Sequence, residues 1–185
     1  MRRIRIVVAY DGTNYCGWQI QPNGITIEEI LNRQISKLTG EDIRIIGASR
    51  TDSGVHALGN VAVFDTESRI PGDRFAYALN QKMPEDIVIV RSDEVQIDWH
   101  PRYQNEISKT YEYHIYNAKV RNPLKNRYST FVSFDLDVEK MRQGAKYILG
   151  EHDFASFCNV RTNAKDTVRT VHEITITEIP MDKFQ

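Results

Sequence analysis

The sequence predicts an α+β protein built on a mainly antiparallel sheet with helices on one face, because its apolar residues follow two different periods. Some segments alternate apolar and polar residues, as half-buried strands do, and others repeat apolar residues at helical spacing. In the first half of the chain these segments come in the order strand, helix, strand, strand, helix, strand. That order is the ferredoxin-like βαββαβ arrangement, and RNA-recognition modules bind RNA on the open face of such a sheet.

The first strand is expected over residues 3–10, where Ile4, Ile6 and Val8 lie on the buried face. A loop over residues 11–24 follows, and it carries two aromatic residues, Tyr15 and Trp18. Their rings either cover the edge of the core or offer a platform for a nucleic acid base. The sequence leaves both interpretations open.

The first helix is expected over residues 26–39. Thr26 and Glu29 form a capping box at its start, and Gly40 is a typical signal for its end. The apolar residues between them recur at helical spacing: Ile27, Ile30, Leu31, Ile35 and Leu38.

Four more elements complete the first domain, which we place at residues 1–98. Strands are expected over residues 43–48 and 59–65, and a fourth strand begins at Ile87. A second helix should begin at Pro71 and end at Pro84, because proline is tolerated in a first helical turn and breaks a helix interior.

The second half of the chain begins to repeat this pattern and stops early. A strand is expected over residues 108–116, a helix over 138–149 and a strand over 168–179. We therefore expect a partial second domain, residues 99–185, without its final strand and helix. The buried stripe of its helix would consist of Met141, Ala145, Ile148 and Leu149.

A short polar loop at residues 49–57 connects the second and third expected strands. It contains Arg50, Asp52 and Gly54. One interpretation is a plain turn, because Asp bonds nearby backbone amides and Gly accepts a positive φ. The other is a reactive carboxylate: in an extended segment Arg50 and Asp52 share one face, and a guanidinium favours an ionised carboxylate, which is a potential nucleophile.

The same loop closely resembles the signature motif of the TruA-type tRNA pseudouridine synthase A family. The matching residues run from Arg50 through Thr51, Asp52, Gly54 and Val55 to His56. Four further stretches resemble family landmarks in the family's order: Tyr10-Asp11-Gly12 with Gly17-Trp18-Gln19; Ala78-Leu79-Asn80; Lys109-Thr110-Tyr111-Glu112-Tyr113; and residues 150–157.

The resemblance implies an isomerase that converts uridine to pseudouridine without a cofactor, at uridines 38, 39 and 40 in the anticodon arm of tRNA. By this resemblance Asp52 is the nucleophile, and whether it attacks C6 of uracil or C1′ of ribose stays open. Arg50 corresponds to the residue that takes part in base flipping and partners the carboxylate, and Tyr111 to the ring that stacks on the target base.

Each of these roles has a structural alternative. Arg50 could instead be a structural partner of Asp52 or Asp65, and Tyr111 could be a core residue of a half-buried strand, which Tyr113 fits better. His56 is expected to be a structural hydrogen-bonding residue. Two basic clusters are either solvated loops or phosphate contacts: Lys119, Arg121, Lys125 and Arg127; and Arg161, Lys165 and Arg169. As substrate-binding residues we select Lys125 and Arg127.

Family members continue into a C-terminal motif that this sequence lacks. We therefore expect a C-terminally truncated chain, about three quarters of a full-length member. In the family a basic residue of that motif pairs with the catalytic aspartate, so the chain alone is expected to be weakly active or inactive. The resemblance also implies a homodimer with tRNA spanning both subunits.

Composition restricts the alternatives. A net charge of −1 does not by itself indicate a polyanionic partner, so RNA would need a local basic face.

Cys16 and Cys158 lie far apart and no secretory leader is evident, which predicts a reduced, cytoplasmic setting. No apolar run reaches the length of about 20 residues that a membrane helix needs. The five histidines lack metal-site spacing, so we expect no metal.

Two rival functions remain. A non-catalytic RNA-binding module would use the same sheet face without needing Asp52. A glycosidase-like hydrolase would also use a carboxylate at C1′, but it needs a second acid about 5–10 Å away, and the loop at residues 49–57 supplies none.

Overall fold

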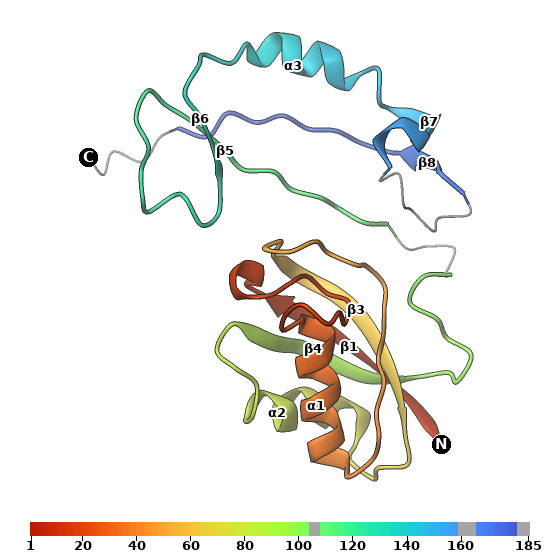
Figure 1. The fold of residues 1–185 in the computed structure, drawn as a ribbon. Helices are drawn as coiled ribbons and strands as arrows, with labels where there is room; N and C mark the ends of the chain where they lie inside the picture. Colours follow the sequence, from red (N-terminus) through yellow and green to blue (C-terminus); the bar gives the residue numbers. More distant parts are fainter. Residues whose placement is uncertain (104–107, 159–165, 181–185) are drawn as a thin grey trace. The chain divides into compact units, whose positions relative to one another are not determined.

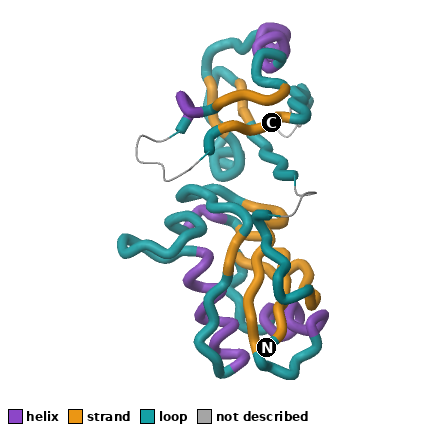
Figure 2. Tube along the Cα trace, turned by 90° about the vertical axis from the view of Figure 1, so that its right-hand side faces the viewer, coloured by secondary structure: helices purple, strands orange, loops and turns teal. Residues whose placement is uncertain are grey.

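The computed structural model describes residues 1–103, 108–158 and 166–180 of the chain (Figure 1). The chain divides into two units, Met1–Tyr111 and Glu112–Gln185. Figure 2 shows strands and helices in both of them.

The first unit is a four-stranded antiparallel sheet with helices on one face. Its elements follow in the order β1 (Arg2–Tyr10), α1 (Ile27–Thr39), β2 (Ile46–Gly47), β3 (Ala57–Thr66), α2 (Phe75–Asn80) and β4 (Ile87–Val95). The strand order across the sheet is β2-β3-β1-β4. Each βαβ unit is therefore split by a strand of the other, and the predicted ferredoxin-like arrangement is confirmed. Figure 1 shows α1 and α2 on the same side of the sheet.

The alternation in β1 decides which face of the sheet is covered. Ile4, Ile6 and Val8 are fully buried beneath the helices, whereas Arg3 and Arg5 between them are half-buried on the opposite face. Phe64 and Phe75 join sheet to helix through an edge-to-face ring contact with centroids 5.3 Å apart. The core therefore lies on one side of the sheet and leaves the other side open to ligands.

The first helix forms as its sequence predicts. The Thr26 hydroxyl accepts a hydrogen bond from the Glu29 amide at 3.3 Å, and Gly40 ends the helix in the left-handed conformation. Ile27, Leu31 and Ile35 are fully buried against the sheet. Cap and apolar stripe thus specify the same helix, which explains why its bounds were predictable.

Two elements of the first unit are shorter than predicted. Strand pairing at residues 43–48 is limited to β2 (Ile46–Gly47), because the amides of Ile43 and Ile45 donate to the side chains of Ser36 and Asn32 on α1. The second helix is a 3₁₀ turn, η2 (Gly72–Arg74), followed by α2 (Phe75–Asn80). It ends at Asn80 because that side chain bonds the backbone of Ile89 on β4. The third strand is longer than expected, and the fourth begins at Ile87 as predicted and extends to Val95.

The first unit includes the segment that follows β4, so the division comes after Tyr111 rather than after residue 98. Arg3 donates to the Trp99 carbonyl at 2.9 Å, and Arg102 and Lys109 donate to the carbonyls of Gly47 and Ala48. These contacts hold the segment on the open face of the sheet and at its β2 edge.

The second unit contains short paired strands and one helix. Strands β5 (Ile115–Asn117) and β6 (Thr130–Val132) pair in parallel, α3 (Val138–Ala145) follows, and β7 (Gly150–Asp153) pairs with β8 (Val168–Val171). A 3₁₀ turn, η3 (Ala155–Phe157), follows β7. None of the residues described in this unit is buried.

The predicted elements of the second unit are mostly wrong in extent. The strands expected over residues 108–116 and 168–179 shrink to β5 and β8, and the helix expected over 138–149 ends at Ala145. Its expected buried stripe is not buried: Met141 and Ala145 are half-exposed, and Ile148 and Leu149 are exposed. Apolar periodicity fixes an element only where a partner surface receives the apolar face, and the described residues of this unit provide no such buried surface.

No helix in the described ranges is long and apolar enough to cross a membrane.

The buried ring of Phe75 should carry a large share of the stability of the first unit. Phe75→Ala is expected to lower the free energy of unfolding by about 3–5 kcal/mol, because it removes a fully buried ring and leaves a cavity. Tyr77→Ala on the same helix is the control: Tyr77 is 71% exposed, so its removal should change stability by no more than about 0.5 kcal/mol. Urea unfolding followed by the fluorescence of buried Trp18 measures both, and equal losses would contradict the burial of Phe75 in the core.

Candidate functional site

The loop at residues 49–57 is fixed by backbone hydrogen bonds to the loop that follows β1. The Trp18 amide donates to the Thr51 carbonyl at 3.0 Å, and the Gly54 amide donates to the Tyr15 carbonyl at 3.3 Å. The Ser53 hydroxyl donates to the same Tyr15 carbonyl. These hydrogen bonds join the two loops and fix the backbone on both sides of Asp52.

Close approach of the two loops requires glycine at Gly12. A Cβ atom built there would overlap the carbonyl oxygen of Val55. The Tyr10-Asp11-Gly12 and Gly17-Trp18-Gln19 stretches are thus the support of the 49–57 loop. Trp18 also packs its indole ring against Gly47, where a Cβ atom would lie 2.6 Å from the ring.

A buried hydrogen-bond network joins β1, β3 and the loop. The Asn60 side chain donates to the Ser49 carbonyl at 3.1 Å and accepts from the Ser49 amide at 3.2 Å. The Tyr10 hydroxyl lies 2.8 Å from the Thr51 hydroxyl and accepts from Asn60. Burial raises the pKa of Tyr10 against the opposing effect of these two hydrogen bonds, so the phenol stays protonated at neutral pH.

Tyr15 anchors the supporting loop to the start of β4. Its ring is buried and its hydroxyl donates to the Asp86 carboxylate at 2.6 Å. Burial raises the pKa of Tyr15, and the bond to Asp86 raises it further. Of the two interpretations of the loop aromatics, core packing is confirmed: Tyr15 is 7% and Trp18 1% exposed, so neither ring is available to a base.

Asp52 occupies the first position of a tight turn and is exposed. The Val55 amide donates to the Asp52 carbonyl at 3.2 Å, and Gly54 adopts a φ of 78°, which a type II turn requires at its third position. Arg50 is also exposed. The segment is therefore a turn rather than an extended strand, and no ion pair joins Arg50 to Asp52 or Asp65 in the part of the chain that the structure describes.

His56 links the loop to the residues after β1. Its Nδ1 atom lies 3.2 Å from the Gly12 amide nitrogen and 3.1 Å from an Asp11 carboxylate oxygen. One Nδ1 cannot both accept from the amide and donate to the carboxylate. The backbone fixes the direction of the Gly12 N–H, so we assign Nδ1 as the acceptor of this hydrogen bond. This bond agrees with the structural role expected for His56.

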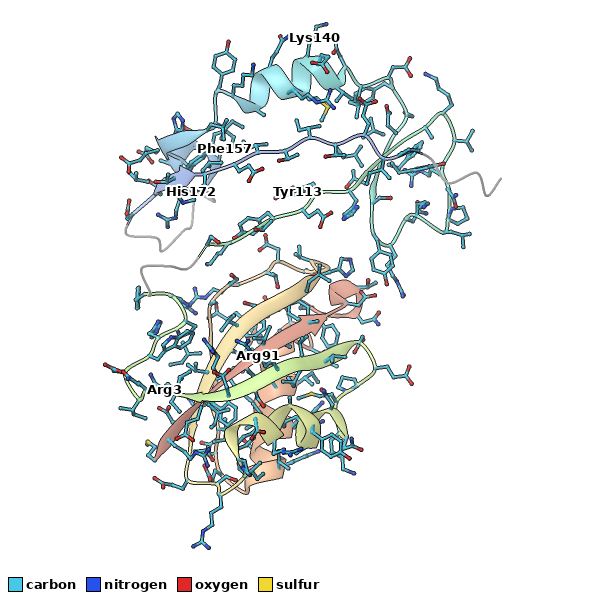
Figure 3. The ribbon with its side chains drawn as sticks, turned by 180° about the vertical axis from the view of Figure 1, so that it is seen from behind. Arg3, Arg91, Tyr113, Lys140, Phe157 and His172 are labelled. Atoms are coloured by element: carbon cyan, nitrogen blue, oxygen red, sulfur yellow. The ribbon has the colours of Figure 1, made fainter. Side chains whose placement is uncertain are left out.

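The other expected site residues lie at or beyond the end of the first unit. Tyr111 is its last residue and is 69% exposed. Tyr113, labelled in Figure 3, is 86% exposed, so the core-packing alternative for both rings is wrong in this structure. Lys125 and Arg127 are exposed in a turn region of the second unit. Of the second basic cluster, Arg161 and Lys165 lie outside the described residues.

Sequence reasoning missed Tyr10 and Asn60 as residues that hold the loop. Asn60 carried a usable signal: asparagine is depleted in strands, and a buried amide must be hydrogen-bonded. An asparagine within an apolar strand that follows a candidate loop therefore indicates a side chain that binds backbone nearby. Tyr10 carried no comparable signal, because its hydroxyl meets Thr51 only through the fold.

Within the described ranges, no group of three or more His, Cys, Asp or Glu side chains is arranged to hold a metal ion.

Comparison with known proteins places this geometry in a family. A family model described as "tRNA pseudouridine synthase" matches residues 6–104 and 145–185. The chain belongs to the tRNA pseudouridine synthase family. The first matched segment contains the whole 49–57 loop, both of its supporting stretches and Asn60. Tyr111, Lys125 and Arg127 lie between the two matched segments.

Curated relatives agree with this family. The chain is 49% identical to a tRNA pseudouridine synthase A of Acetivibrio thermocellus over 176 residues, which is 95% of this chain and 72% of that protein. It is 44% identical to the synthase A of Brevibacillus brevis, across 97% of this chain and 73% of that protein. A third family member, from Geotalea daltonii, is 43% identical with the same coverage. The chain thus spans about three quarters of the length of these relatives.

The hydrogen bonds of Asn60 should stabilise the conformation of the 49–57 loop more than they stabilise the fold as a whole. Asn60→Ala leaves the Ser49 amide and carbonyl without their partner, at a cost of about 1–3 kcal/mol. We expect amide hydrogen exchange to accelerate by about tenfold or more at residues 49–55, since 1.4 kcal/mol corresponds to a factor of ten.

Asn80→Ala is the matched control, because Asn80 makes the same pair of backbone bonds to Ile89 on β4. It should accelerate exchange near β4 and leave residues 49–55 unchanged. Equal acceleration of the loop in both variants would show that Asn60 has no specific role there.

Proposed function

We propose that this protein converts uridine to pseudouridine in tRNA, with Asp52 as the nucleophile. The observation that carries the proposal is an exposed carboxylate on a loop whose backbone is fixed on both sides. Turn geometry, Tyr15, Trp18 and Asn60 hold the loop, while the Asp52 side chain stays accessible. Such a group can reach a substrate without first ordering its own backbone, which lowers the entropic cost of the reaction.

The chemistry is an isomerisation that needs no external oxidant or reductant. The bond between N1 of uracil and C1′ of ribose breaks, the base turns, and C5 bonds to C1′. C5 then loses its proton and N1 gains one. A carboxylate that attacks either C6 of the base or C1′ of the sugar forms a temporary covalent bond and leaves again, so Asp52 is regenerated.

We propose that Arg50 and Tyr111 assist base flipping, Arg50 at the space that the base leaves and Tyr111 by stacking on the base. A uridine in a stem must leave its stack before a carboxylate can reach it. Arg50 is exposed two residues before Asp52, where a guanidinium can enter the space that the base leaves. The exposed ring of Tyr111 is free of core packing, and stacking on a base contributes about 1–3 kcal/mol.

The finer assignments follow from the family alone. We propose the anticodon arm as the target region, at uridines 38, 39 and 40, and Lys125 and Arg127 as phosphate contacts. A homodimer and a cytoplasmic location stay predictions.

Replacing Asp52 with asparagine tests the proposed nucleophile. With protein in excess over an unmodified tRNA transcript labelled with tritium at C5 of uridine, the wild-type chain is expected to release tritium only slowly, as a weakly active chain would over a long incubation. Asp52→Asn should release it about a thousandfold more slowly or not at all, because an amide is a poor nucleophile, and it should still bind the transcript.

Asp42→Asn is the control, since it makes the same chemical change at another exposed carboxylate and should leave release unchanged. Binding without any release by the wild-type chain, even after long incubation, would contradict the proposed activity and leave RNA binding as the function of this chain. Free uracil among the products would favour a hydrolase.

A further inference from the structure

A groove of about 160 Å³ lies on the open face of the first unit's sheet. Its floor is formed by Val7 of β1 and Val61 of β3, which are cross-strand partners. Trp99 and Pro101 line it from the segment that follows β4. Figure 3 looks onto the sheet from the side away from α1 and α2, and it shows Arg91 over this face. The groove thus combines an apolar floor, an aromatic wall and cationic side chains.

The two arginines that line the groove differ in their partners. Arg5 is neutralised, because its guanidinium forms two bonds with the Asp93 carboxylate at 3.0 and 2.5 Å and packs over Trp99 with its carbon 5.3 Å from the ring centroid. Arg91 lies 3.9 Å from the same carboxylate, and its side chain is 63% exposed. Asp93 is already bound by Arg5 at close range. The Arg91 guanidinium is therefore only weakly paired and can bind an anion in the groove.

The groove adjoins the loop that carries Asp52 along the chain. Ala48 lines the groove and is directly followed by Ser49 and Arg50. Arg102 and Lys109 donate to the carbonyls of Gly47 and Ala48, so two more cationic side chains lie at this edge. A polyanionic strand that reached Asp52 could continue past Ala48 to the cationic side chains of the groove.

We propose that this groove binds a segment of the RNA strand next to the target uridine, with Arg91 contacting a phosphate. Val7, Val61 and Trp99 supply the apolar surface on which a ribose or base rests. Phosphate contacts position a nucleic acid, and aromatic surfaces hold its bases without regard to sequence. The inference rests on the proposed function for its ligand, and it names positioning residues that lie outside the 49–57 loop.

Arg91→Gln tests the groove through the salt dependence of binding. The measurement uses the Asp52→Asn protein and an unmodified tRNA transcript, so that binding is observed without turnover. Loss of one phosphate contact should reduce the slope of log affinity against log salt by about 0.7–0.9. At about 0.1 M monovalent salt this corresponds to binding weakened by about five- to eightfold.

Arg74→Gln is the matched control, because Arg74 has a similar environment away from the groove. Its side chain is 70% exposed and lies 3.6 Å from Asp73, in the η2 turn that leads into α2. This variant makes the same change of charge and should leave both slope and affinity unchanged. Equal effects of the two substitutions would show a general charge effect and overturn the groove proposal.

The fluorescence of Trp99 gives a local signal that a change of charge elsewhere on the protein would not alter. The chain has two tryptophans, Trp18 is 1% exposed, and Trp99 lines the groove. Quenching of the emission by acrylamide therefore reports mainly on Trp99, and saturating tRNA transcript should protect it. A Trp99→Phe variant should lose this signal. Unchanged quenching in the presence of bound RNA would place the RNA elsewhere.

Failure of this inference is distinguishable from failure of the proposed function. If Asp52 is catalytic but the groove is not used, Asp52→Asn abolishes tritium release while Arg91→Gln binds like the control. If the groove binds RNA but Asp52 is not the nucleophile, Arg91→Gln lowers the salt slope while Asp52→Asn keeps its release.

Discussion

The contact between the 49–57 loop and the loop after β1 is the constraint on which the candidate site depends. A polar turn has little apolar surface to bury, so backbone hydrogen bonds must hold it in one conformation. The Trp18 amide and the Tyr15 carbonyl provide these bonds, and Gly12 lets the chains approach closely enough to form them. Tyr15 in turn is tied to Asp86, and the Asp11 amide donates to the carbonyl of the same residue. The position of Asp52 is therefore set by the loop after β1, which is itself tied to the residue that precedes β4.

The two faces of the sheet carry different kinds of side chain. Alternation in β1 directs Ile4, Ile6 and Val8 to the helices and leaves Arg3, Arg5 and Val7 on the other side. Most cations there are paired, Arg3 with Asp65 and Arg5 with Asp93, which lets a protein with a net charge of −1 keep an ordered basic surface. Arg91 is the less neutralised of the arginines in the groove. A local charge pattern of this kind matters more for nucleic acid binding than the sum of charges over the chain.

The two units differ in how far their side chains are buried. In the described part of the first, helices and sheet cover one another and twenty hydrophobic side chains are buried. In the described part of the second unit every residue is at least partly exposed, and its elements are short. This contrast follows from elementary energetics: a short strand or helix is marginal by itself and persists through the apolar surface that it buries.

The sequence by itself determined the architecture of the first unit and the location of its polar loop. The period of two in β1, the Thr26 cap and Gly40 are local signals that agree with the tertiary structure, so they could be interpreted without it. Motif resemblance then indicated Asp52 and the family. The tertiary structure alone decided the partners: that Asn60 binds Ser49, that Ile43 and Ile45 bond to α1 rather than to β3, and that Trp99 folds back over Arg5. These pairs join residues that are distant along the chain, and no local pattern encodes a contact whose two halves meet only when the sheet has formed.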